Sequence, residues 1–233
     1  MTCPAELRRA RLDAARVMLL FTPELCSGRD PGETLAALLP EVDAVQIRVK
    51  PVGGPPRPAG TPGPPAEARG TLDWTRRALR LRDELAPRAL VLVDDRVDVA
   101  LALAAEGCDG VHVGRGDLAA REARALLGPE LLLGLSTHDV GQVLSAAEEP
   151  VDYLGFGPVF ATATKGYAAG HGPELAWVAS AGSALPLFPI GGIDLVSAPD
   201  LAEVGRAAVS AALLSAEDPV AAARALRAAL GAR

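Results

Sequence analysis

The chain has 233 residues, enough for one large domain or two small ones. Its formal net charge of −6 argues against a nucleic-acid or membrane-surface partner, because the anionic groups of either would repel it. The hydrophobic fraction of 49% supports one sizeable core, yet no stretch approaches the roughly 20 apolar residues of a membrane span.

The N-terminal segment carries several arginines ahead of an apolar run at 17–21, an order that resembles a secretory signal. The run is too short for a signal peptide and leads into a Thr-Pro pair, not a small-residue cleavage site. Cys3, Cys26 and Cys108 cannot all pair within one chain and lack metal-ligand spacing. We therefore expect free thiols and a cytoplasmic protein.

Short apolar runs alternate with amphipathic stretches eight times, the pattern of a parallel sheet with crossover helices. The predicted strands are Val17–Thr22, Ala44–Lys50, Ala89–Asp95, Gly110–Gly114, Leu131–Thr137, Tyr153–Val159, Leu187–Gly191 and Ala207–Ala212. The predicted helices are 31–40, 71–86, 97–106, 118–127, 139–148, 173–181, 198–204 and 218–230. Eight such units predict an α/β fold, a parallel eight-stranded (β/α)₈ TIM barrel, as a single domain over residues 1–233.

Residues 51–70 interrupt this pattern after the second predicted strand. The segment contains seven prolines and five glycines, too few backbone donors for regular structure. It follows the end of a strand, on the face where barrel active sites lie. A flexible lid and an insertion without a role both fit this composition.

Polar residues at the C-terminal ends of barrel strands are the functional candidates. The second strand ends with Gln46, Arg48 and Lys50, and strand alternation places these three side chains on one side. A buried strand tolerates inward cations only with an anionic partner. The pattern favours a phosphate or diphosphate ligand, with solvated charges at a fraying strand end as the alternative.

Carboxylates follow the next two strands. Asp94 and Asp95 end the third, and Asp117 follows the fourth. Each aspartate by itself is often a helix N-cap. Together, on neighbouring strands, they form a candidate Mg²⁺ site, because magnesium commonly takes one or two protein carboxylates and leaves its other positions to water and phosphate.

Two histidines lie near the fourth and fifth strand ends. Ser136 and His138 could orient a substrate through a hydroxyl and an imidazole, although a helix cap by His138 is equally ordinary. His112 alternates with apolar residues of the fourth strand. We expect it to be a satisfied core histidine and not a ligand.

The later strand ends offer a second anion site. Thr162, Thr164 and Lys165 lie in a long loop that could wrap an anion with hydroxyls, amides and one ammonium, although a polar surface loop has the same composition. Gly192 follows the seventh strand and would let backbone amides approach closely, near Ser210 after the eighth. Phosphate often lies at these two loops in such barrels.

The order and spacing of these motifs resemble the thiamine phosphate synthase and thiazole tautomerase family, over essentially the whole chain from the first strand onward. The matching segments are 45–50, 95–101, 110–114, 136–138, 157–160, 162–165, 190–193 and 216–219. The resemblance implies a transferase of thiamine biosynthesis with small-molecule substrates. It would join aminomethylpyrimidine diphosphate to thiazole phosphate and release pyrophosphate, through a stabilised pyrimidine cation.

The resemblance also implies roles for individual residues. The pyrimidine diphosphate would be held by Gln46, Arg48, Lys50, Ser136 and Lys165, all but the first with a part in catalysis. Mg²⁺ would be bound by Asp95 and Asp117. The thiazole phosphate would be received by Thr162, Thr164, Gly192, Val209 and Ser210.

Two positions depart from the family pattern at the leaving-group side. The family usually has Asn at the position of Asp94 and Gln at that of Arg115, and it lacks so long a Pro/Gly insertion. We hypothesise that the two residues border the substrate as a compensating pair, in which Arg115 cancels the added charge of Asp94. A double-mutant cycle between them would then be non-additive.

Two alternatives keep the same barrel. A thiazole tautomerase would use a histidine at the position of His138 and often lacks the magnesium aspartates, so the presence of Asp95 and Asp117 favours the synthase. A non-catalytic barrel that binds thiazole phosphate would not need the diphosphate side. The set of Gln46, Arg48 and Lys50 argues against it. The sequence leaves the oligomeric state open.

Overall fold

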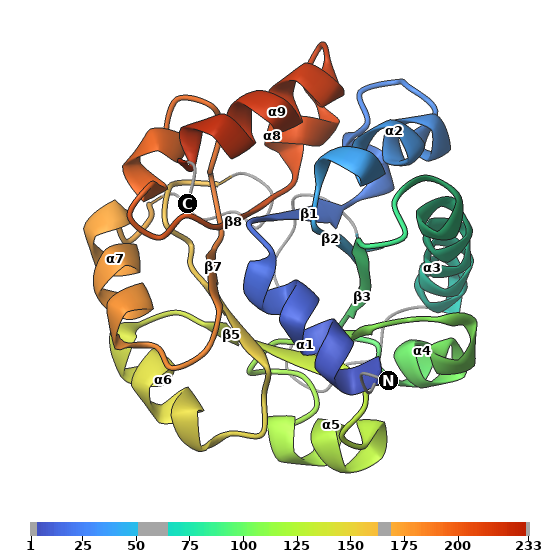
Figure 1. The fold of residues 1–233 in the computed structure, drawn as a ribbon, viewed down its shortest axis with the longest axis horizontal. Coiled ribbons are helices and arrows are strands. Elements are labelled where there is room, and N and C mark those ends of the chain that lie inside the picture. The colour runs from blue at the N-terminus through green and yellow to red at the C-terminus, as the bar shows by residue number, and fades with distance from the viewer. Residues whose placement is uncertain (1–3, 51–64, 163–168, 232–233) are drawn as a thin grey trace.

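The computed structural model describes residues 4–50, 65–162 and 169–231. Eight parallel strands form one sheet in the order β7-β6-β5-β4-β3-β2-β1-β8. Neighbouring strands pair over three or four residues, whereas the two ends of this order meet in the described residues through one bridge, between Ile190 and Ala208. Helices surround the closed sheet, which confirms the predicted (β/α)₈ barrel (Figure 1).

The elements follow one another in the expected alternation. The strands are β1 (Val17–Phe21), β2 (Ala44–Ile47), β3 (Leu90–Asp94), β4 (Gly110–Val113), β5 (Leu132–Thr137), β6 (Tyr153–Phe156), β7 (Leu187–Pro189) and β8 (Ala207–Val209). The α-helices of the described residues are α1 (Pro4–Ala14), α2 (Pro31–Leu38), α3 (Pro65–Leu85), α4 (Val97–Ala102), α5 (Ala120–Leu127), α6 (Val140–Ser145), α7 (Pro173–Gly182), α8 (Ala211–Leu214) and α9 (Pro219–Ala229). Single 3₁₀ turns are η1 (Pro23–Leu25), η2 (Leu39–Glu41), η3 (Ala104–Glu106), η4 (Ala146–Glu148) and η5 (Ala198–Leu201).

Several strands are shorter than their apolar runs predict. β2 stops at Ile47 and not at residue 50, because its pairing with β1 and β3 ends there. Residues 211–212 were expected in the eighth strand but begin helix α8. The change occurs at Ser210, whose backbone angles (φ −132°, ψ −88°) leave the extended conformation. The chain therefore leaves the sheet at Ser210.

Two predicted helices differ clearly from the structure, one at its start and one in its length. Helix α3 begins at Pro65, so residues 65–70 of the Pro/Gly-rich segment are helical; the first turn accepts proline because its N–H would have no partner there. The remainder, 51–64, lies outside the described residues. The helix expected over 198–204 is only the 3₁₀ turn η5, Ala198–Leu201. Helix α1 was not predicted at all.

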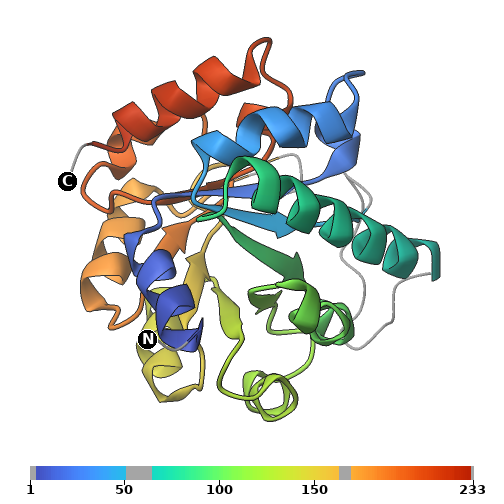
Figure 2. The ribbon, with the colours of Figure 1, turned by 45° about the vertical axis from the view of Figure 1, so that its right-hand side comes forward.

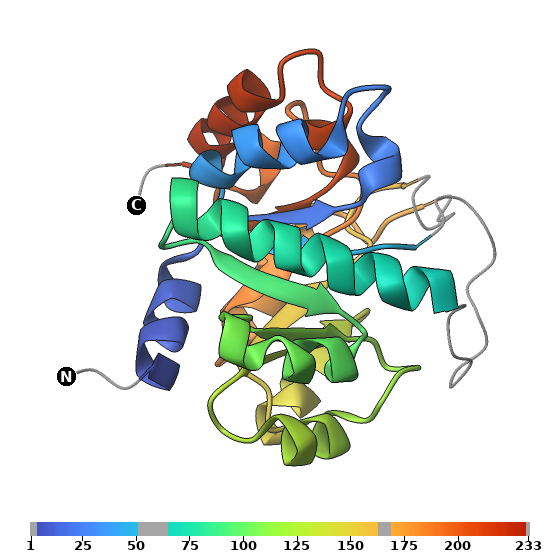
Figure 3. The same ribbon diagram turned by 90° about the vertical axis from the view of Figure 1, so that its right-hand side faces the viewer.

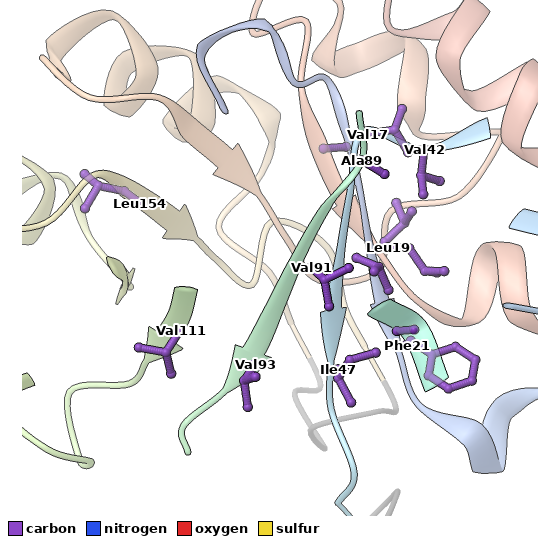
Figure 4. Close-up of a cluster of buried hydrophobic side chains, with 14 of the residues drawn as sticks. Val17, Leu19, Phe21, Val42, Ile47, Ala89, Val91, Val93, Val111 and Leu154 are labelled. Carbon is purple, nitrogen blue, oxygen red and sulfur yellow. The ribbon is translucent and has the colours of Figure 1, made fainter. Parts of the chain in front are cut away.

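Successive strand residues alternate between two apolar layers. The outer layer packs against the helices and includes Val17, Leu19, Phe21, Ile47, Val91, Val93, Val111 and Leu154 (Figure 4). The inner layer fills the barrel and includes Met18, Leu20, Leu90, Leu92, Leu132, Tyr153 and Phe188. Side chains that continue the inner series toward the strand ends must point into the barrel.

The helices form the outer ring. Helix α2 packs between α3 and α9, and the three lie side by side along one flank of the strands (Figure 2). Asp30, Asp139 and Asp218 cap α2, α6 and α9 by accepting a bond from a backbone N–H three residues on. Within the described ranges, no helix combines the length and the apolar character that crossing a bilayer requires.

Helix α1 closes the N-terminal end of the barrel. It crosses the opening in Figure 1 and lies at the end away from the strand arrowheads in Figure 3. Arg8 Nε lies 3.0 Å from Asp109 Oδ1, and Arg9 Nε lies 2.8 Å from Asp152 Oδ1. The arginines whose order resembles a secretory signal thus pair with aspartates that precede β4 and β6.

Candidate functional site

A cavity of about 230 Å³ lies at the C-terminal ends of the strands. Inner-layer side chains such as Met18, Tyr153 and Phe188 form its apolar floor. The predicted site residues that line it are Gln46, Arg48, Lys50, Asp94, Asp95, Asp117, Ser136, Thr162, Gly192, Val209 and Ser210. Thr164 and Lys165 lie outside the described residues.

One side of the cavity, the β2 wall, consists of Gln46, Arg48 and Lys50. The first two are 3% and 8% exposed, although both side chains are polar. Gln46 Nε2 donates to Asp94 Oδ1 at 3.1 Å, and Arg48 Nε lies 3.8 Å from Asp94 Oδ2. Arg48 Nη1 is buried and has no hydrogen-bond partner among the described residues. A buried guanidinium with an unused donor suits an anionic ligand.

The Lys50 ammonium lies between two carboxylates. Its Nζ is 3.0 Å from Asp94 Oδ2 and also donates to Asp95 Oδ2. Burial by itself would lower the pKa of Lys50, but the charges of Asp94 and Asp95 outweigh burial and hold that pKa above its ordinary value. Lys50 is therefore a cation in this site.

Asp95 faces the cavity because its backbone is left-handed, with φ 59°. Burial and the neighbouring charge of Asp94 raise the pKa of Asp95 to about 7, against the opposing effect of Lys50. Helix α4 has Arg96 at its N-cap position, so Asp95 is not the cap that its place in the sequence also allowed. Its side chain therefore faces the cavity, where it accepts the hydrogen bond from Lys50.

Asp117 follows β4 and lies near Asp95. Because of this proximity, its charge contributes to raising the pKa of Asp95. Asp117 Oδ2 accepts a bond from the Gly114 N–H at 2.9 Å, which orders the loop after β4. It is not a helix cap either, since the N-cap of α5 is Ala119. Two aspartates from adjacent strands therefore face one cavity.

This pair fits a magnesium ion by the chemistry of its donors. Carboxylate oxygens are hard ligands, and Mg²⁺ usually takes only one or two of them besides water and phosphate. Across the described ranges, no cluster of three or more His, Cys, Asp or Glu side chains gathers as a metal site. The residues present thus fit an ion that substrate oxygens would help to bind better than one held wholly by protein.

His112 lies in the cavity lining and is more than a core residue. Its Nε2 lies 2.9 Å from Ser136 Oγ on the neighbouring strand. The imidazole fits because its neighbours are glycines: a Cβ on Gly134 would lie 2.5 Å from His112 Nδ1, and one on Gly155 would lie 3.2 Å from Cε1. Strand alternation could have identified His112 as a cavity residue, because it pairs in register with Asp94, which lines the same cavity.

His138 is held by a single ring nitrogen. Its Nδ1 lies 2.6 Å from the Gly157 carbonyl oxygen. A carbonyl can only accept, so Nδ1 carries a proton, and Nε2 of the neutral ring is left as the acceptor. The residue lines the cavity, and the N-cap of α6 is Asp139. His138 is therefore neither a cap nor a core residue.

Another side of the cavity, the β7–β8 wall, is formed by residues that follow β7 and β8. Gly191 and Gly192 have left-handed φ values of 99° and 65°, and a Cβ on Gly192 would lie 2.3 Å from the Ala161 carbonyl oxygen. Ser210 Oγ donates to the Leu20 carbonyl oxygen at 2.8 Å, just before α8 begins. Glycine loops and the start of a short helix present amides to an anion.

Arg115 does not join the cavity lining. Its Nη2 donates to the Gln142 carbonyl oxygen at 3.4 Å, toward α6. Among the described residues, Lys50 and Arg48 are cations that lie beside Asp94. The structure thus separates the two departures from the family pattern, and the charge of Asp94 is balanced within the β2 wall.

Comparisons with known proteins agree with this architecture. A family model described as thiamine monophosphate synthase matches residues 17–214. The thiamine-phosphate synthase of Albidiferax ferrireducens is 38% identical over 93% of this chain and 92% of its own length. The solved thiamine phosphate pyrophosphorylase from Pyrococcus furiosus has a TM-score of 0.74 and 28% identity, over 95% of this chain and 96% of its own.

Other relatives are longer. The thiamine-phosphate synthase of Synechococcus sp. (strain WH7803) is 49% identical over 59% of this chain, which spans 39% of that relative. That of Gloeobacter violaceus is 41% identical over 91% of this chain and 56% of its own length. This chain thus spans less than two thirds of these relatives. Because the family model covers the barrel from β1 to α8, this chain belongs to the thiamine monophosphate synthase family.

Proposed function

We propose that this chain catalyses the Mg²⁺-dependent coupling of aminomethylpyrimidine diphosphate with thiazole phosphate, giving thiamine phosphate and pyrophosphate. The observation that carries the proposal is that one cavity is lined both by the cations of the β2 wall and by the glycines and Ser210 of the β7–β8 wall, two groups of residues that suit anionic ligands. A reaction that joins two phosphorylated substrates needs both. The apolar floor between them suits the heterocycles.

The β2 wall would bind the leaving group. As the bond between the pyrimidine methylene carbon and the diphosphate oxygen breaks, negative charge develops on the diphosphate. Arg48 and Lys50 stand where such charge is stabilised by fixed cations. No protein nucleophile is required, because the departing diphosphate leaves a pyrimidine cation that the thiazole nitrogen captures.

The metal would act on the same side. Asp95 and Asp117 would hold Mg²⁺, which supplies charge neutralisation to the leaving diphosphate. Gln46 and Ser136 would orient the pyrimidine end of that substrate. Lys165, which lies outside the described residues, is proposed to complete this set.

The β7–β8 wall would bind the thiazole phosphate, with Gly192, Val209 and Ser210 against it and Thr162 from the β6 loop. Thr164 is proposed as a further contact outside the described residues. Met18, Leu20 and other inner-layer residues close the barrel beneath and keep water from the cation. We further propose one domain over residues 1–233 and a cytoplasmic location, supported by two buried free thiols.

The decisive experiment mixes the protein with both substrates and Mg²⁺ and measures thiamine phosphate and pyrophosphate. We expect the two products in equal amounts, and no product after EDTA treatment until Mg²⁺ is restored. Arg48→Met should prevent turnover while thiazole phosphate still binds, because only the β2 wall is changed. Product formation that EDTA does not reduce would overturn the metal assignment. Binding of thiazole phosphate by the unmodified chain without any turnover would indicate a non-catalytic barrel.

A second candidate is thiazole tautomerase activity. It is favoured by His138, whose Nε2 is left as a proton acceptor by the bond from Nδ1 to Gly157. The two activities separate cleanly in one pair of assays. Isomerisation of the thiazole without coupling, lost in His138→Asn, would assign the chain to the tautomerase.

A further inference from the structure

We infer that Lys50 is a placeholder for the metal, that is, a cation that pairs with the metal ligand Asp95 while no metal is bound. Mg²⁺ must displace the Lys50 ammonium from the Asp95 carboxylate before that carboxylate can bind the ion. The displaced ammonium then becomes available to the diphosphate. Metal and diphosphate binding are therefore coupled through one side chain. This inference rests on the proposed function, since both ligands belong to the proposed reaction.

The contacts of Lys50 carry the first step. Nζ touches Asp95 Oδ2 and lies 3.0 Å from Asp94 Oδ2, so one ammonium bridges two carboxylates. The three side chains retain exposures of 25%, 20% and 12% for Lys50, Asp95 and Asp94. An arriving ion can therefore reach the pair without opening the barrel. An ammonium and Mg²⁺ cannot share the same carboxylate oxygen without strong repulsion.

The charge balance of the cavity carries the second step. The described side chains that line it include three carboxylates and two cations besides histidine, a balance of 2 − 3 = −1. If Lys50 stayed on the aspartates when the metal bound, Mg²⁺ would meet a site whose carboxylates were already largely neutralised. If Lys50 moves, its charge is transferred to the side where the diphosphate is expected.

The third step rests on the presence of lysine, and not arginine, at position 50. Of the 23 basic residues in the chain only two are lysines, Lys50 and Lys165, and both belong to the predicted site. Lysine carries a compact charge on a flexible stem with rotatable donors, whereas arginine forms a rigid fork. Arg48, next to Lys50 in the β2 wall, is 8% exposed and lies beside Asp94. A cation that must change partners suits lysine.

The test measures metal binding without substrate. Mn²⁺ replaces Mg²⁺ as the probe, and free Mn²⁺ is followed by electron paramagnetic resonance. We expect Lys50→Met to bind Mn²⁺ about tenfold more tightly than the unmodified chain, a usual size for such coupling. Arg48→Met is the matched control, and it should change the Mn²⁺ affinity much less. Asp95→Asn should abolish the binding.

Nuclear magnetic resonance adds an independent readout. Protein labelled with ¹³C and ¹⁵N in lysine shows only two side-chain signals, and Lys165→Arg assigns them. We expect Mg²⁺ alone to shift the Lys50 signal, and inorganic pyrophosphate added afterwards to shift it again. A Lys50 signal that stays constant while the metal site saturates would overturn the inference.

The outcomes separate this inference from the proposed function. If the unmodified chain binds Mn²⁺ and forms thiamine phosphate, but Lys50→Met binds Mn²⁺ no more tightly, only the placeholder role is overturned. If Arg48→Met tightens Mn²⁺ binding as much as Lys50→Met, general electrostatics explains the effect and the role is again overturned. If the unmodified chain binds no Mn²⁺, the metal assignment and the placeholder role are both overturned.

Discussion

Asp94 is in contact with most of the β2 wall. It accepts a hydrogen bond from Gln46 Nε2 and lies beside the cationic groups of Lys50 and Arg48. An asparagine at this position would present one donor nitrogen to those cations, whereas a carboxylate presents only acceptors. The acidic residue therefore orders the wall that the proposed leaving group would meet.

The contacts of Asp94 revise the hypothesis of a compensating pair. We expect the cycle between Asp94→Asn and Arg115→Gln to be additive within about 0.5 kcal/mol in kcat/KM, because Arg115 contacts Gln142 on another element. The cycle between Asp94→Asn and Lys50→Met should be non-additive, since these side chains touch. Steady-state kinetics on the three single and two double variants decides between the two pairs. Strong coupling to Arg115 would restore the original hypothesis.

His112 should affect the reaction through Ser136. We expect His112→Ala to lower kcat/KM about 10- to 100-fold, because the lost hydrogen bond leaves the partly buried Ser136 hydroxyl without this partner. The loss should fall mainly on kcat, and His112→Gln, which keeps a hydrogen-bonding group, should recover part of it. Steady-state kinetics at saturating thiazole phosphate, with thermal unfolding as a check on folding, measures the effect. Equal losses in both variants would indicate a packing role only.

The sequence predicted most of the residues that border the cavity, Arg115 excepted, but not how they are paired. Strand alternation sufficed to place Gln46, Arg48 and Lys50 on one side, because parity needs only the strand itself. The contact between His112 and Ser136 depends on the register of β4 with β5, which no local pattern sets. Thr164 and Lys165 remain predictions, since they lie outside the described residues.

At the scale of elements, three alternate strands are each preceded by an aspartate that makes the same kinds of contact. Asp43, Asp109 and Asp152 precede β2, β4 and β6, and each accepts a backbone N–H from the preceding strand. Each also pairs with an arginine from the helix ring: Arg227, Arg82 and Arg124 respectively. The carboxylates thus join strand to strand and sheet to helix at the end opposite the cavity, the end associated with stability in this fold.

Removing one of these carboxylates should destabilise the barrel. We expect Asp152→Asn to lower the free energy of unfolding by about 3 kcal/mol, because Arg9 and Arg124 would keep their charges without a buried anionic partner. Chemical denaturation measures the change. Glu106→Gln is the control: its pair with Arg76 is about half exposed on both sides, and its loss should be far smaller. Comparable losses would contradict the argument.

The element boundaries show where sequence patterns stop being informative. The eight strand cores were predictable because continuous apolar runs reflect burial on both faces. The strand ends were not, since pairing stops before the apolar run does, as at Ile47. Helix α1 was missed because it is mainly polar, with only Ala5 and Leu12 buried, and its position depends on aspartates far along the chain.

At the scale of the whole molecule, two thiols report on whether the barrel is closed. Cys26 and Cys108 are 2% and 0% exposed, and burial raises the pKa of both, that of Cys108 to about 12. In a Cys3→Ser variant at pH 8 we expect both thiols to react with a disulfide reagent only as fast as the protein opens, because the thiolate is the reactive form. Denaturant should expose both together. Rapid labelling of Cys108 in the native protein would contradict this.

The helix across the N-terminal end has a consequence for how the chain is made. Arg8 and Arg9 are translated before their partners Asp109 and Asp152, which lie 101 and 143 residues further along. Both ion pairs of helix α1 can therefore form only after the residue that precedes β6 has been translated. Until then a nascent barrel lacks these contacts across its N-terminal end, although the first five strands have already been made.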